Sequence, residues 1–183
     1  MPYRFEGHAI VSADDRIADA DGNMPPTLSH PADWAQFQSA LDRAAAIILG
    51  RKSHQAKPDQ RSGKRIVMSR SVSGLDRRAD GWWWNPDGAA LEEVLANVAP
   101  HGGLVAVPGG REVFDYFLDA GLDAFFLSRV AGLHLPGGVP VFSEVANGKS
   151  AAAILDAHGL RPREHEVFDA EAGVSLTVWR KWA

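Results

Sequence analysis

Residues 46–53, with the sequence AIILGRKS, decide the fold of this chain because they join an apolar strand to a cluster of polar groups. The apolar run is typical of a buried strand, and it ends in Gly50, Arg51, Lys52 and Ser53. The run RIVM at 65–68 ends in the same way, in Ser69, Arg70 and Ser71. Ligands of open α/β sheets bind at the carboxyl ends of the strands. The two strand ends predict a site for an anion such as a phosphate monoester, although solvated loops after strands have the same composition.

A third strand end, VPGG at 107–110, runs directly into a helical pattern that starts at Arg111. Glycines allow the backbone to approach a ligand closely, and a helix N-terminus offers free N–H groups. This pattern favours a diphosphate site, but a tight strand-to-helix turn gives the same residues. The sequence contains neither GxGxxG nor GxxxxGK[ST], so it predicts neither a Rossmann fingerprint nor a P-loop.

Strands and helices alternate along the chain, which predicts one α/β domain over residues 1–183 with a mostly parallel sheet. The segment 14–28 is rich in Asp, Gly and Pro and predicts a long loop. The tail, 163–183, predicts two antiparallel strands joined around Ala172-Gly173 at the edge of the sheet. Further strands are expected at 5–13, 46–50, 64–71, 81–84, 103–110 and 122–133, and helices at 29–44, 85–98 and 111–121.

Two helix starts can be read from capping residues. Ser29 or His30 before Pro31 marks the first, because proline is tolerated in the first turn. Asn85 as N-cap with Pro86 at the first helical position marks the second.

Composition excludes several classes of protein. The 183 residues include no cysteine, so there is no disulfide, thiol nucleophile or thiolate metal site. The seven histidines show no metal-ligand spacing, and we expect no metal. The net charge of -4 gives no basic field for nucleic acid. No apolar run reaches the roughly 20 residues that span a membrane, and the N-terminus lacks a secretory pattern. We therefore expect a cytoplasmic protein, monomeric or homodimeric, that acts on a small molecule.

Asp33 lies in the first turn of the expected helix, within the sequence PADWAQF, next to Trp34 and one turn before Phe37. A carboxylate at this place commonly caps the helix or complements its dipole. The alternative is a carboxylate in an apolar cleft that pairs with the planar N–H edge of a ligand.

Seven segments, in order and with suitable gaps, resemble the dihydrofolate reductase superfamily, which also contains the reductase domain of riboflavin biosynthesis. They are GNMPP (22–26), PADWAQF (31–37), ILGRKS (48–53), RIVMSR (65–70), VPGGREVF (107–114), AFFLSRV (124–130) and PVF after a Gly-Gly turn (140–142). The resemblance covers about residues 8–143 and continues plausibly through the final strand pair. It implies a dihydrofolate reductase-like three-layer sandwich with an antiparallel C-terminal edge.

That family binds NADPH, and the resemblance implies which residues would hold it. Arg51, Ser69 and Arg70 would surround the 2′-phosphate, while Lys52 and Ser53, after Gly50, would face the diphosphate. Ile17 would lie near the nicotinamide carboxamide, with Met24 on a mobile loop that covers the ring. The diphosphate and the nicotinamide side would be lined by Gly109, Gly110, Arg111, Glu112 and Val113.

For the substrate, the resemblance implies that Asp33 binds the 2-amino group and ring N–H of a pterin. Phe37 would pack on that ring, and Ser128 would stand near Asp33 through water. The implied activity is an NADPH-dependent reduction of a C=N bond, with dihydrofolate as the first candidate substrate. A phosphorylated aminopyrimidine of the riboflavin pathway is the second, and a nucleotide-binding module without turnover is the third reading.

The sequence departs from the family pattern in ways that concern the substrate. Pro26 stands in place of a tryptophan, Phe114 in place of a common tyrosine and His54 in place of an aromatic residue. The arginine that would clamp a folate glutamate has no clean match, and Lys64 and Arg65 are nearest. The segment LPGGVPVF is more similar to the riboflavin-type reductases.

Overall fold

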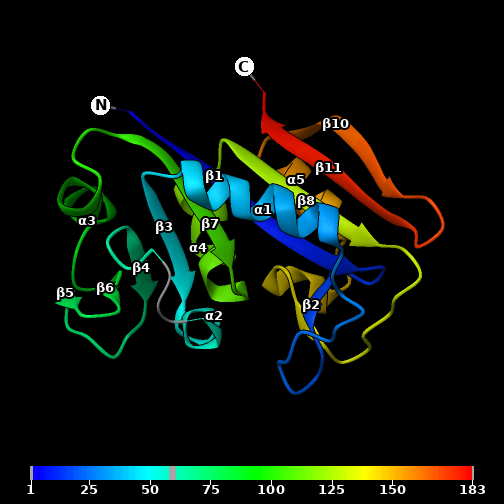
Figure 1. The fold of residues 1–183 in the computed structure, drawn as a ribbon, viewed down its shortest axis with the longest axis horizontal. Helices are drawn as coiled ribbons and strands as arrows, with labels where there is room; N and C mark the ends of the chain where they lie inside the picture. The colour runs from blue at the N-terminus through cyan, green and yellow to red at the C-terminus, as the bar shows by residue number, and fades with distance from the viewer. Residues whose placement is uncertain (1, 58–60, 183) are drawn as a thin grey trace.

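A computed structural model describes residues 2–57 and 61–182, and its centre is a twisted sheet (Figure 1). Within those residues nine strands form this sheet in the order β10-β11-β8-β1-β7-β3-β4-β6-β5. Their bounds are β1 (Tyr3–Ser12), β3 (Ala46–Gly50), β4 (Arg65–Met68), β5 (Leu75–Arg78), β6 (Gly81–Trp84), β7 (Gly103–Gly109), β8 (Ala124–Val130), β10 (Leu160–Asp169) and β11 (Val174–Lys181).

The middle of the sheet is parallel and its two edges are antiparallel. Strand β1 pairs in parallel with β7 and β8, and β3 pairs in parallel with β7 and β4. Strand β11 pairs antiparallel with β8 and with β10, which confirms the antiparallel edge expected at the C-terminus. At the other edge β5 returns antiparallel to β6. The mostly parallel α/β fold expected from the sequence is therefore confirmed.

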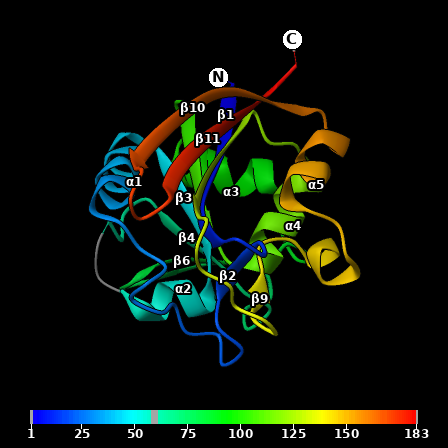
Figure 2. The ribbon, with the colours of Figure 1, turned by 90° about the vertical axis from the view of Figure 1, so that its right-hand side faces the viewer.

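Helices cover both faces, so the architecture is a three-layer sandwich. Figure 2 shows α1 (Pro31–Arg43) on one face and α3 (Leu91–Val98), α4 (Arg111–Ala120) and α5 (Ala151–Ala157) on the other. Alternation along the strands explains this division, because successive side chains point to opposite faces. Ile47 and Leu49 of β3 pack with Leu41 of α1, whereas Ile48 joins the larger core that contains Phe114 and Phe117 of α4.

The helix expected at 85–98 starts later than its capping signal predicted. The N-cap of α3 is Ala90 and its first residue is Leu91. Asn85 instead holds a turn, because its Nδ2 donates to the Val72 carbonyl and its Oδ1 accepts from the Asp87 backbone N–H. The local side-chain turn thus competes with helix formation. The other capping prediction is correct, since His30 is the N-cap of α1 and accepts from the Ala32 N–H.

Several elements had no clear sequence signal. The residues after β3 form a short helix, α2 (Arg51–Ala56), rather than a loop. The expected long loop contains β2 (Arg16–Ala18), which pairs with β9 (Val139–Pro140) in a separate small sheet. Strand β5, the 3-10 helix η1 (Ser143–Asn147) and α5 were also not anticipated.

Candidate active site

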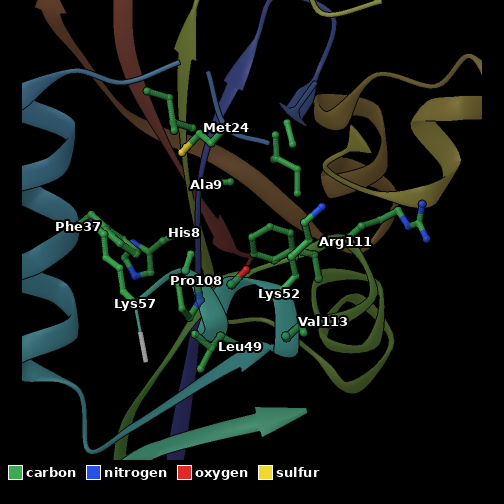
Figure 3. A pocket seen from close by; sticks show the side chains of 18 of the residues that line it. His8, Ala9, Met24, Phe37, Leu49, Lys52, Lys57, Pro108, Arg111 and Val113 are labelled. Atoms are coloured by element: carbon green, nitrogen blue, oxygen red, sulfur yellow. The ribbon is translucent and has the colours of Figure 1, made fainter. Parts of the chain in front are cut away.

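A cleft of about 1150 Å³ opens between α1, the segment from Ile17 to Met24, and the carboxyl ends of β3, β4 and β7. Figure 3 shows it from close by, with Met24 and Phe37 on its walls. The residues predicted for cofactor and substrate converge here from elements far apart in the chain. Those that line the cleft are Ile17, Met24, Asp33, Phe37, Gly50, Arg51, Lys52, Ser53, Ser69, Arg70, Gly110, Arg111, Glu112 and Val113.

One end of the cleft carries exposed cations from two neighbouring strand ends. Strands β3 and β4 are in register with Gly50 beside Met68, so Arg51 and Ser69 follow at adjacent positions. Arg51 and Arg70 are both exposed, and neither forms an ion pair within the described residues. Ser69 and Ser71 share a hydrogen bond between their hydroxyls at 2.9 Å. Two uncommitted guanidinium groups beside these hydroxyls form a suitable environment for a phosphate.

Two glycines shape the neighbouring wall at the start of α4. Gly109 has a φ of +109°, and a Cβ there would lie 2.7 Å from the Phe114 ring, so only glycine fits. Gly110 is the N-cap of α4, and no side chain there accepts a hydrogen bond from the first backbone N–H groups of the helix. A Cβ at Gly110 would meet no atom within 4 Å, which leaves open space in front of the helix N-terminus. Free backbone N–H groups facing open space can bind an anionic group of a ligand.

Arg111 and Val113, in the first turn of α4, point in different directions. Figure 3 shows Arg111 extending away from the other labelled side chains, while Val113 points into the site. Arg111 lies 4.0 Å from Glu112, and its Nε has no hydrogen-bond partner among the described atoms. Arg111, Glu112 and Val113 all line the cleft, and Val113 is the one of them whose side chain points into the site in Figure 3.

Lys52 takes part in a contact that was not expected. Its Nζ donates to the Asp21 carbonyl at 3.3 Å, and it lies against Gly22 in the turn at 19–23. Asp19 holds that turn, because its Oδ1 accepts from the backbone N–H groups of Asp21 and Asn23. Lys52 thus connects α2 to the segment above the cleft, and it also lines the cleft. The diphosphate contact that the family resemblance implied for Lys52 stays a prediction.

Asp33 lies at the opposite end of the cleft, one turn before Phe37 on α1. Burial raises the pKa of its carboxyl above the usual range, while the Ser128 hydroxyl and His30 partly oppose this shift. Ser128 on β8 is fully buried and does not line the cleft itself. Its Oγ has no hydrogen-bond partner within the described residues. A half-buried carboxylate of this kind is suited to an N–H edge of a ligand.

Two large apolar side chains are exposed at the rim of the cleft. Met24 is 56% exposed and Trp34 is 46% exposed, and both line the cleft. Lys57 lies 3.8 Å above the centre of the Trp34 ring. Large exposed apolar groups beside a concave site are typical of a surface that a ligand covers.

His8 is a cleft residue that sequence reasoning missed. It lies on β1, is 3% exposed, and its ring stacks on Phe126 with the centres 4.7 Å apart. A histidine between Gly7 and Ala9 in the first strand was the available signal, but a lone histidine in a strand is most often a satisfied core residue.

The two cations nearest to a folate-clamp position are engaged elsewhere. Lys64 donates from Nζ to the carbonyls of Leu41, Asp42 and Ala44, and so caps the C-terminus of α1. Arg65 is buried, and its Nη1 contacts the Lys57 carbonyl and His54 Nδ1. These contacts hold the fold together around α1 and α2.

No group of three or more His, Asp or Glu side chains in the described part of the chain is placed to hold a metal ion. Likewise, no helix in that part is long and apolar enough to cross a membrane.

The fold and the position of the cleft define the chain as a protein with the dihydrofolate reductase-like fold. A protein assigned to riboflavin biosynthesis from Shewanella sp. PV-4 superposes with a TM-score of 0.66 at 18% identity, covering 98% of this chain and 99% of that one. Dihydrofolate reductase from Enterococcus faecalis, complexed with NADP(H) and RAB-propyl, superposes with a TM-score of 0.62 at 15% identity, covering 97% and 95%.

A third similar structure is that of a protein named for two activities. The diaminohydroxyphosphoribosylaminopyrimidine deaminase/5-amino-6-(5-phosphoribosylamino)uracil reductase from Thermotoga maritima superposes with a TM-score of 0.62 at 18% identity. The match covers 99% of this chain but 57% of that one. No protein-family model matches the sequence, and a search of curated proteins also finds no match.

Proposed function

We propose that this protein is an NADPH-dependent reductase of a small heterocycle that carries a C=N bond. The single observation that carries the proposal is the division of one cleft into two chemical ends. Uncommitted guanidinium groups of Arg51 and Arg70 lie at one end, and the half-buried carboxylate of Asp33 lies at the other. An elongated ligand pair, one phosphorylated and one with an N–H edge, suits this arrangement.

The residues present fit NADPH. Arg51, Ser69 and Arg70 would hold its 2′-phosphate, and the free N–H groups at the start of α4 would hold the diphosphate. Gly110 leaves room there, and Val113 faces the same space. When bound, NADPH supplies the hydride for the reduction. Lys52 would stay with the turn at 19–23 and hold it over the cleft.

Asp33 and the apolar walls would position the substrate. The carboxylate accepts two N–H donors of the heterocycle, and the contact is strongest when the ring is protonated. Its raised pKa places it closer to neutral pH, which suits a group that takes part in protonating a ring nitrogen. Met24 and Phe37 would exclude water and hold the two rings in contact.

Dihydrofolate and a phosphorylated aminopyrimidine remain the two candidate substrates. Asp33 in its helix favours a pterin. The engagement of Lys64 and Arg65 in structural contacts favours the second candidate, because neither side chain is placed to clamp a glutamate tail. Pro26 in place of a tryptophan also argues against a standard folate site.

A panel assay tests the proposal. Loss of reduced nicotinamide absorbance would be followed with dihydrofolate, dihydrobiopterin and the phosphorylated aminopyrimidine substrate of riboflavin biosynthesis. Turnover with one of them, lost in Asp33→Asn, supports a reductase. NADPH binding without turnover of any compound would favour a nucleotide-binding module and contradict the proposed activity.

A further inference from the structure

The floor of the cleft beneath α1 holds a histidine whose ring nitrogens bind nothing. His8 is almost fully buried, and neither Nδ1 nor Nε2 has a hydrogen-bond partner among the described residues. The nearby Glu6 Oε2 is 4.0 Å from Nε2, which is beyond hydrogen-bond length. A buried polar group without a partner destabilises a protein. For stability alone, an apolar side chain would therefore suit this position better than His8 does.

The position of His8 relates it to the substrate end of the cleft. Its ring stacks nearly parallel to Phe126, with ring centres 4.7 Å apart, and the Phe37 ring lies 6.2 Å away, tilted by 59°. Figure 3 shows His8 beside Phe37, which lies between it and α1 in this view. Phe37 is one helical turn after Asp33. His8 thus lies under the aromatic side chain that is expected to pack on the substrate ring.

The chemical state of the imidazole follows from its surroundings. Burial lowers the pKa of His8 to about 4, and the charge of Arg43 acts in the same direction. The ring is therefore neutral near pH 7, with one N–H donor and one acceptor nitrogen. It can form a neutral hydrogen bond but cannot hold an anion by charge.

We propose that His8 is a substrate-contacting residue that donates a hydrogen bond to a ring carbonyl of the heterocycle. Asp33 would bind the N–H edge and His8 the neighbouring oxo group, so the site would select 2-amino-4-oxo rings of the pyrimidine or pterin class. Phe37 is half-buried and its ring centre is 6.2 Å from that of His8, so its side chain would have to rotate to pack on a substrate ring that reaches the imidazole. This inference rests on the proposed function.

Two substitutions separate recognition from packing. His8→Phe keeps an aromatic ring to stack on Phe126 and removes both nitrogens, while His8→Asn keeps a donor. The probes are isocytosine, which carries the 4-oxo group, and 2-aminopyrimidine, which lacks it, with binding followed by ligand-observed NMR in the presence of NADPH. A site built to hydrogen-bond a group rejects an analogue without it.

For His8→Phe we expect isocytosine to bind at least fivefold more weakly and the preference for isocytosine over 2-aminopyrimidine to fall by the same factor. NADPH affinity should stay within twofold, and the melting temperature should be equal or higher. His8→Asn should recover part of the preference. If His8→Phe keeps the wild-type preference, or weakens NADPH and both probes equally, the inference is overturned.

The wild-type protein distinguishes failure of this inference from failure of the proposed function. If wild type binds neither probe and turns over none of the panel substrates, both the reductase proposal and the inference about His8 fail. If wild type is active and selective while His8→Phe remains equally selective, only the role of His8 fails.

Discussion

The Ser128 hydroxyl on β8 faces the Asp33 carboxyl on α1 and lowers its pKa, against a larger opposing effect of burial that raises it. Two residues far apart in the sequence thus come close together beside the cleft, although Ser128 Oγ makes no hydrogen bond among the described residues. The net shift makes ionisation of this carboxyl less favourable than it would be in water. A ligand that brings N–H donors to Asp33 would relieve this cost.

Asp33→Asn should reduce turnover without loss of stability. Asn keeps the shape but removes the charge and replaces one acceptor by a donor. We expect kcat/KM to fall by about 30- to 1000-fold, corresponding to roughly 2–4 kcal/mol, with NADPH affinity unchanged. Steady-state kinetics on the substrate that the panel identifies and a cofactor titration measure this. Unchanged kcat/KM would leave Asp33 with a structural role only.

The same variant should show a pH-dependent gain in stability. The folded-state pKa of Asp33 is raised, so the folded protein holds the proton more tightly than the unfolded chain does. Folding is therefore disfavoured progressively as pH rises from the ordinary Asp pKa through the raised value. The melting temperature of Asp33→Asn relative to wild type should be higher at pH 7 than below both pKa values. A difference that is independent of pH would contradict this explanation.

Arg51→Ala should weaken NADPH and leave NADH nearly unaffected. Charge-assisted hydrogen bonds contribute about 1.5–3 kcal/mol each, and 1.4 kcal/mol corresponds to a tenfold change in affinity. The wild-type protein should accordingly prefer NADPH by about tenfold or more. Fluorescence titration with both cofactors is the measurement. Arg163→Ala on the exposed strand β10, outside the cleft, is the control, and equal weakening of both cofactors by Arg51→Ala would rule out a 2′-phosphate site.

Substitution by alanine should reduce stability at Gly109 and NADPH affinity at Gly110. Gly109→Ala places a Cβ 2.7 Å from the Phe114 ring at a φ of +109°, so we expect a loss of roughly 2–4 kcal/mol of stability. Gly110→Ala meets no atom within 4 Å and should keep the wild-type melting temperature while weakening NADPH. Thermal melts and cofactor titrations separate the two effects. A stable Gly109→Ala protein would contradict the described turn.

The lid above the cleft should be confined to residues 19–27. The first part of the expected mobile loop is anchored, because buried Asp15 binds Arg129 and accepts from the Ala151 N–H at 2.9 Å, and β2 pairs with β9. Hydrogen exchange should therefore show residues 14–18 protected with and without NADPH, and residues 19–27 protected only with it. Equal exchange of 19–27 in both states would argue against closure over a ligand.

The sequence by itself determined the elements with strong local signals. The apolar run before Gly50 can only be buried, and it forms β3; Pro31 after His30 starts α1 where expected. The order of strand ends predicted the cation end of the cleft because parallel strands place their carboxyl ends at one edge. Motifs around Asp33 and Gly109-Gly110 likewise located the two other walls.

Other features depended on partners that are distant in the sequence, so local propensity carried little information about them. Lys64 is one of the cations nearest to the family's clamp position in the sequence, yet its Nζ donates to three carbonyls at the end of α1. Asn85 had the signal of a helix cap, yet the Val72 carbonyl holds it in a turn. The ring nitrogens of His8 have no hydrogen-bond partner among the described residues, and the pKa of Asp33 is raised. Both properties arise because α1 packs near β1 and β8 and removes water from these two side chains. Burial and the choice among competing hydrogen bonds are properties of the tertiary structure.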